Sequence, residues 1–155
     1  MASVYLETTI PSYLAARPSR DLVIAAHQQV TSHWWHTARE RFDVQVSEAV
    51  LAEIRVGDAN AAKKRLALIR DLPVLRVNDL VRSLALQYRE NLELPRKAAA
   101  DVVHIAFSVA YEIDYLVTWN FKHIANGEVV RRLREKNLEL RVFTPLILTP
   151  EELME

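Results

Sequence analysis

The segment ADVVHIAFSVAYEIDYLVTWN, residues 100–120, places a long apolar helix directly before the most apolar strand of the chain. We expect the helix to begin at Pro95, because proline suits the first turn of a helix, and the strand to span residues 115–119. Residues 4–6 and 43–47 have the same β-branched or aromatic character and predict two further strands. Helical and extended segments therefore alternate along the chain.

Apolar residues at helical spacing predict the remaining helices. They cover residues 19–42, 48–57, 59–72, 80–92 and 127–137, with Asn78 or Asp79 as the N-cap of the fourth, and further strands are expected at 73–77 and 140–144. Parallel strands separated by helical segments are joined by right-handed crossovers, which produce a sheet with helices on both faces. The pattern therefore predicts an α/β fold.

Composition limits the classes of function. The 155 residues suit a single domain, residues 1–155, in which 146–155 form a C-terminal extension. Cysteine is absent, which excludes thiolate catalysis, and twenty Lys and Arg balance twenty Asp and Glu, which leaves no overall positive field. No apolar run approaches the ~18 residues that span a bilayer, and the first residues lack a signal-peptide pattern. We expect a cytoplasmic protein without a membrane partner.

Acidic and amide side chains gather where an α/β fold places its binding site. In an open parallel sheet that site lies at the carboxyl ends of the strands, beside the point where the strand order reverses. Glu7 follows the first strand and Asn120 follows the strand at 115–119. Glu53 and Asp101 lie on otherwise apolar helical segments. Taken singly, each acid also suits a cap or a half-exposed helix position, but together they predict one site.

Three carboxylates at one site repel one another unless a cation neutralises them. A divalent ion keeps them ionised, and oxygen ligands without cysteine favour a hard ion, Mg²⁺ or Mn²⁺. Such a centre suits hydrolysis of phosphodiesters, because the ion holds a phosphate oxygen, activates a water and offsets charge on the leaving oxygen. The sequence therefore predicts a metal site formed by Glu7, Glu53 and Asp101.

Three segments, VYLETTIPSYL (4–14), VSEAVLAEI (46–54) and residues 100–120, resemble the PIN domains, and among them the VapC-type toxin ribonucleases of toxin–antitoxin modules. The resemblance runs from Val4 to Phe143. It implies a three-layer α/β/α sandwich around a central parallel sheet of about five strands. It also implies metal-dependent endonucleolytic cleavage of RNA, a cognate antitoxin that occupies the site, and a homodimer.

The resemblance also assigns roles to single residues. Glu7, Glu53 and Asp101 stand at the positions of metal-binding acids and Asn120 at that of a fourth acid, and these four form the predicted catalytic set. Supporting positions are matched by Thr8 or Thr9, by Thr118 and by His104. Glutamate in place of the usual aspartate at residue 7 adds one methylene of reach, and asparagine at residue 120 removes a charge. Both departures weaken the predicted metal site.

Several alternatives remain open. His104 also suits a packed histidine that donates to a backbone carbonyl, while Arg96, Lys97 and His123 are candidates for RNA contacts or are merely solvated. Of Trp34 and Trp35, we expect one in the core and the other at a partner surface. The rival function is a non-catalytic PIN-like module that binds RNA or protein and has a weakened metal site.

Overall fold

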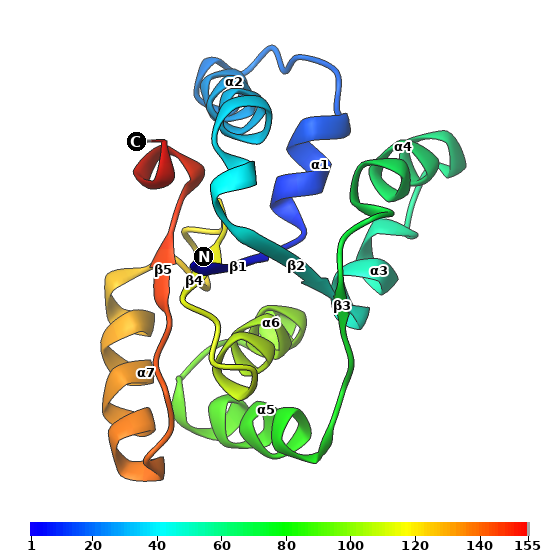
Figure 1. Cartoon of the computed structure of the whole chain (residues 1–155). Helices are drawn as coiled ribbons and strands as arrows, with labels where there is room; N and C mark the ends of the chain where they lie inside the picture. The colour runs from blue at the N-terminus through cyan, green and yellow to red at the C-terminus, as the bar shows by residue number, and fades with distance from the viewer. Residues whose placement is uncertain (155) are drawn as a thin grey trace.

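Five parallel strands form one central sheet in the computed structural model, which describes residues 1–154. They are β1 (Ser3–Leu6), β2 (Asp43–Ser47), β3 (Val74–Leu75), β4 (Tyr115–Val117) and β5 (Leu146–Leu148). Their order is β3-β2-β1-β4-β5, with β1 at the centre and every neighbouring pair parallel. Helices cover both faces of the sheet (Figure 1). The predicted PIN-like, three-layer α/β/α sandwich is confirmed.

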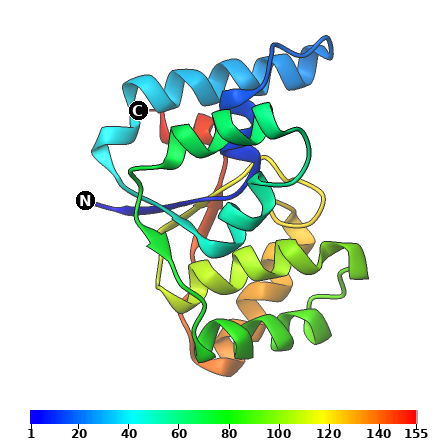
Figure 2. The same cartoon turned by 90° about the vertical axis from the view of Figure 1, so that its right-hand side faces the viewer.

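Two groups of helices form the outer layers. The α-helices of the described chain are α1 (Thr9–Ala15), α2 (Leu22–Thr37), α3 (Glu48–Ile54), α4 (Ala59–Ile69), α5 (Asp79–Asn91), α6 (Ala99–Ala110) and α7 (Gly127–Leu140), with 3-10 turns at Arg39–Arg41, Arg96–Ala98 and Pro150–Leu153. Figures 1 and 2 show α1, α2 and α4 on one face and α5, α6 and α7 on the other. Within residues 1–154, no helix has both the length and the apolarity to cross a membrane.

Side-chain caps explain where helices begin. Asn78 Oδ1 accepts a hydrogen bond from the N–H of Val81, 2.8 Å away, at the start of α5. Asp21 caps α2 in the same way. Such a cap satisfies backbone donors that the first turn of a helix leaves unpaired. Of the two residues expected to cap α5, Asn78 is therefore the one that does so.

Both tryptophans of α2 are buried, so the expectation that one of them lies at a partner surface is wrong. Trp34 is wholly enclosed and Trp35 is 6% exposed. The guanidinium carbon of Arg39 lies 4.0 Å from the centre of the Trp35 ring, a cation–π contact. The 3-10 turn that follows α2 thus covers the Trp35 ring through the side chain of Arg39.

Helix α1 occupies residues 9–15, a segment that is not among the predicted helices. Pro11 lies in the first turn of this helix, where its missing N–H removes no intrahelical bond. Ile10 and Pro11 are buried against the sheet layer. The helix therefore follows β1 with only two residues between them, which fixes the backbone of Glu7 and Thr8.

The last strand lies at residues 146–148, so the expectation of a strand at 140–144 is wrong. Helix α7 continues to Leu140 and ends at Arg141, whose φ of +59° is left-handed. The expected extension at 146–155 instead begins with β5, in which Leu146 pairs with Tyr115 of β4. Side-chain bonding explains the shift, because Asn137 Nδ2 donates to the carbonyl of Phe143 and to Thr144 Oγ1. These bonds hold the segment in an irregular course.

We expect Asn137→Ala to lower the free energy of unfolding by about 2 kcal/mol, because it leaves buried polar groups without a partner. Asn137 is wholly buried, and its Oδ1 accepts from the Tyr88 hydroxyl at 2.6 Å. Urea unfolding would measure the change. Asn60→Ala, at an exposed position of α4, is the control and should stay within about 0.5 kcal/mol of the original chain. Equal stability of the two variants would contradict this account.

Candidate active site

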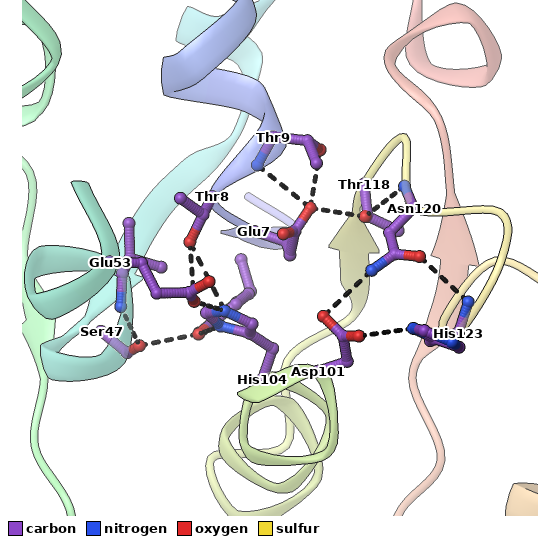
Figure 3. Close-up of polar contacts among 12 residues, drawn as sticks. Glu7, Thr8, Thr9, Ser47, Glu53, Asp101, His104, Thr118, Asn120 and His123 are labelled. Carbon is purple, nitrogen blue, oxygen red and sulfur yellow. Dashed lines mark hydrogen bonds and ion pairs between the residues drawn. The ribbon is translucent and has the colours of Figure 1, made fainter. Parts of the chain in front are cut away.

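The strand order reverses between β1 and β4, and this is where a parallel sheet forms its binding site. Leu6 at the end of β1 lies opposite Val117 at the end of β4. Figure 3 shows the side chains just beyond these ends, with Glu7 between Glu53 on one side and Asp101 and Asn120 on the other. We call these four residues (Glu7, Glu53, Asp101 and Asn120) the acidic site.

Glu7 is only 3% exposed, and its carboxylate is held by hydroxyls from two segments. Its Oε1 accepts from Thr9 Oγ1 and from Thr118 Oγ1, each 2.6 Å away, and from the Thr9 N–H at 3.2 Å. Each hydroxyl in turn accepts a backbone N–H, from Trp119 at 3.0 Å and from Asn120 at 2.9 Å. Hydrogen bonds to a charged acceptor are strong. They therefore fix one oxygen of Glu7 relative to the ends of β1 and β4.

Glu53 ends a chain of buried hydrogen bonds. Its Oε1 accepts from Thr8 Oγ1 at 3.0 Å and is paired with His104 Nε2. Behind the imidazole, the Tyr5 hydroxyl lies 2.6 Å from His104 Nδ1 and 2.7 Å from Ser47 Oγ. These three side chains, His104, Tyr5 and Ser47, are wholly buried. The His104 ring thus joins the Glu53 carboxylate, through Nε2, to the Tyr5 hydroxyl, through Nδ1.

Burial and hydrogen bonding change the pKa of Glu53 in opposite directions. Partial burial of the carboxyl raises its pKa, whereas the hydrogen bond and charge of His104 and the hydrogen bond of Thr8 lower it, and the net effect is a lowered pKa. Burial also raises the pKa of Tyr5 well above its ordinary value. Glu53 is thus kept ionised, and the Tyr5 hydroxyl keeps its proton.

Asp101 lies in the first turn of α6 and has donors on both oxygens. Asn120 Nδ2 donates to its Oδ1 at 3.0 Å, and His123 Nδ1 lies 2.9 Å from its Oδ2. Asn120 Oδ1 accepts the backbone N–H of His123 at 3.0 Å, which closes a ring of contacts (Figure 3). The amide of Asn120 therefore turns its nitrogen, and not its oxygen, toward Asp101.

The structure distinguishes roles that sequence reasoning left open. Thr9 supports Glu7, whereas Thr8 supports Glu53. His104 bonds to the Glu53 carboxylate and to the Tyr5 hydroxyl, so the alternative of a bond to a backbone carbonyl is wrong. Tyr5 and Ser47 were missed as members of the site. The one available signal was a tyrosine inside an otherwise aliphatic strand, whose hydroxyl needs a partner once it is buried.

Two basic side chains lie a few positions before Asp101 in the sequence. Arg96 and Lys97 form the 3-10 turn before α6 and are exposed, and within residues 1–154 neither makes an ion pair with an acid. Arg96 also lines a pocket of about 430 Å³, with Arg89 on its wall. Both side chains remain predicted RNA contacts. His123, the third predicted contact, is instead engaged with Asp101.

The chain is similar to known proteins in fold rather than in overall sequence. No family model matches the chain, and no curated protein matches it. A chain of the VapBC2 complex from Rickettsia felis, bound to a promoter DNA fragment, superimposes with a TM-score of 0.55 and 14% identity, covering 94% of this chain and 97% of that one. Mycobacterium tuberculosis VapC20, described as a Sarcin-Ricin loop cleaving toxin, gives 0.59 and 15%, covering 77% and 92%. This chain has the fold of the VapC toxins.

The side chains of the acidic site are of the kind that a hard cation binds, although they form no complete set of metal ligands. Within residues 1–154, no group of three Asp, Glu or His side chains makes a ready metal site. The bonds to Glu7 and Glu53 all end on Oε1, so no described residue donates to Oε2 of either. Mg²⁺ is commonly held by one or two carboxylates, with waters and substrate phosphate in its other positions. The residues present fit that mode of binding.

Thr118→Val keeps the shape of the side chain and removes the hydroxyl that joins Glu7 to the Asn120 N–H. We expect the free energy of unfolding to fall by about 2 kcal/mol, since a buried carboxylate loses a donor and a backbone donor loses its acceptor. Urea unfolding would measure the loss. Thr37→Val is the matched control, because that hydroxyl is exposed and bonds only within α2. The assignment fails if both variants are equally stable.

Proposed function

We propose that the protein is a metal-dependent endoribonuclease that hydrolyses RNA phosphodiester bonds and acts as the toxin of a toxin–antitoxin pair. The acidic site is the observation that supports this most directly. Its carboxylates come from three distant segments, meet at the switch point of the sheet and are each oriented by separate donors. Side chains that converge at the switch point of an open parallel sheet are typical of binding sites. The likeness in fold to a toxin described as cleaving an RNA loop adds support.

The carboxylates would hold Mg²⁺ or Mn²⁺. Glu7 and Glu53 offer the oxygens without a protein donor, and Asp101 adds the third negative charge. Such an ion, when bound, supplies an activated water and neutralises charge on the phosphate. The chain's own contribution is to hold these acids in place. His104 acts on Glu53 in this way and Asn120 on Asp101.

The remaining proposals concern partners. Arg96 and Lys97, exposed in the 3-10 turn before the helix that carries Asp101, would contact RNA phosphates, which position a substrate without specifying its sequence. His123 is bonded to Asp101, so any contact that it makes with RNA would be made from that bonded position. The VapBC2 structure is a complex, and we propose by analogy that this chain binds a cognate antitoxin. We also propose that it forms a homodimer, as the sequence resemblance implies, and acts in the cytoplasm.

The decisive experiment compares RNA cleavage by the purified chain with Mg²⁺, with Mn²⁺ and with a chelator. We expect chelation to abolish cleavage. We expect Asp101→Asn or Glu53→Gln to reduce cleavage at least about 100-fold, because loss of a direct metal ligand should cost no less than the largest losses seen for residues that only support a ligand. Asp71→Asn is the matched control, because Asp71 is exposed and precedes the edge strand β3, at the end of the sheet opposite to the strand ends that carry the acidic site. Far-ultraviolet circular dichroism would show that each variant is folded.

The rival function makes the opposite prediction. A binding module with a weakened metal site would retain RNA or protein through chelation and through both substitutions, and would show no cleavage with either ion. Cleavage that persists with chelator present and in Asp101→Asn would equally exclude the proposed centre. Wild-type activity that depends on the ion and disappears in the two variants but not in Asp71→Asn would support it.

A further inference from the structure

Three aromatic side chains lie side by side next to the acidic site. His27 of α2 stacks on Trp119, with ring centres 4.0 Å apart and planes 12° from parallel. Phe121 meets both rings edge-on, at 5.9 Å from His27 and 6.0 Å from Trp119. These distances are typical of favourable edge-to-face contacts. We call the group of His27, Trp119 and Phe121 the aromatic ledge.

The aromatic ledge is rigidly connected to the acidic site. The indole N–H of Trp119 donates to Thr31 Oγ1 at 2.7 Å. The backbone N–H of Trp119 donates to Thr9 Oγ1, the hydroxyl that also holds Glu7. A tight turn, in which the Phe121 N–H donates to the Trp119 carbonyl at 3.0 Å, then places Phe121 directly after Asn120. The position of the ledge relative to the carboxylates is therefore set by short bonds.

One ring of the aromatic ledge is open to solvent. Trp119 is 6% exposed, whereas Phe121 is 48% exposed. Single exposed apolar side chains are common and need no explanation by themselves. Phe121 differs because two other rings support it, the acidic site lies one residue away, and the exposed Lys122 follows it. A supported aromatic face beside a cation is how proteins bind single-stranded nucleic acid.

We propose that Phe121, supported by His27 and Trp119, stacks against an unpaired RNA base next to the phosphodiester that the acidic site cleaves. This inference rests on the proposed function, since it takes RNA as the ligand. Aromatic rings recognise bases that are splayed out of a helix, and every base offers a face for stacking. Lys122 contacts a neighbouring phosphate. The aromatic ledge thus places the nucleotide, and the acidic site acts on its backbone.

The test measures binding without cleavage. All variants are made in an Asp101→Asn chain, and fluorescence anisotropy follows their binding to labelled oligoadenylate of about ten nucleotides. A second probe of the same length keeps the phosphates and lacks the bases. We expect Phe121→Ala to weaken oligoadenylate binding about 10-fold, within the range for loss of one stacked base, and Phe121→Trp to restore it. Binding of the abasic probe should not change.

Phe143→Ala is the matched control, because Phe143 is also exposed but precedes β5, and so lies at the opposite end of the strands from the ledge, which follows β4. It should bind both probes as the parent does. The stacking proposal is overturned if Phe121→Ala binds oligoadenylate as tightly as the parent, if it weakens both probes equally, or if the parent does not prefer the probe with bases. Weakened binding of a co-purified partner protein with unchanged RNA binding would make the ledge a protein contact and would also overturn it.

These outcomes are separate from those of the cleavage assay. Metal-dependent cleavage with no effect of Phe121→Ala would leave the nuclease and remove the base-stacking role. Base-dependent binding that requires Phe121, in a chain that never cleaves, would retain the ledge as an RNA contact and remove the nuclease.

Discussion

The hydrogen bonds on Glu7 Oε1 join the two central strands at the point on which the site depends. Glu7 and Thr118 are 111 positions apart in the sequence, yet their side chains meet at 2.6 Å. Thr9 completes the junction from α1. Because each hydroxyl both donates to the carboxylate and accepts a backbone N–H, the direction of every proton is determined. The acids, the loop after β4 and the aromatic ledge are all positioned from this junction.

Each acid of the site is stabilised by its own protein donors. Glu53 has His104 and Thr8, and Asp101 has Asn120 and His123. Negative charge beside apolar helices is unfavourable without a partner, and hydrogen bonds to the ionised form reduce that penalty. A shared cation is therefore not needed for the fold to tolerate these carboxylates. Its proposed role is chemical, and the preformed orientation of the acids would lower the reorganisation that binding requires.

Sequence patterns were sufficient where structure depends on neighbours along the chain. The apolar spacing of α6 and the apolar and aromatic run of β1 predicted both elements, and the rule for strand ends then directed attention to Glu7 and Asn120. Sequence patterns gave wrong predictions where contacts outside the local pattern determine the structure. The buried amide of Asn137 shifts the last strand to residues 146–148, and Arg39 covers Trp35. Neither contact has a periodic signal.

The sequence by itself determined the α/β class, the alternation of elements and the identity of the acids, because residue spacing and turn chemistry act locally. Only the tertiary structure decided which donor serves which acid. Thr8 and Thr9 are adjacent and chemically identical, yet they bond to different glutamates because successive side chains point in different directions. Tyr5 became part of the site in the same way, since burial obliges its hydroxyl to find His104 and Ser47. Such pairings depend on three-dimensional packing.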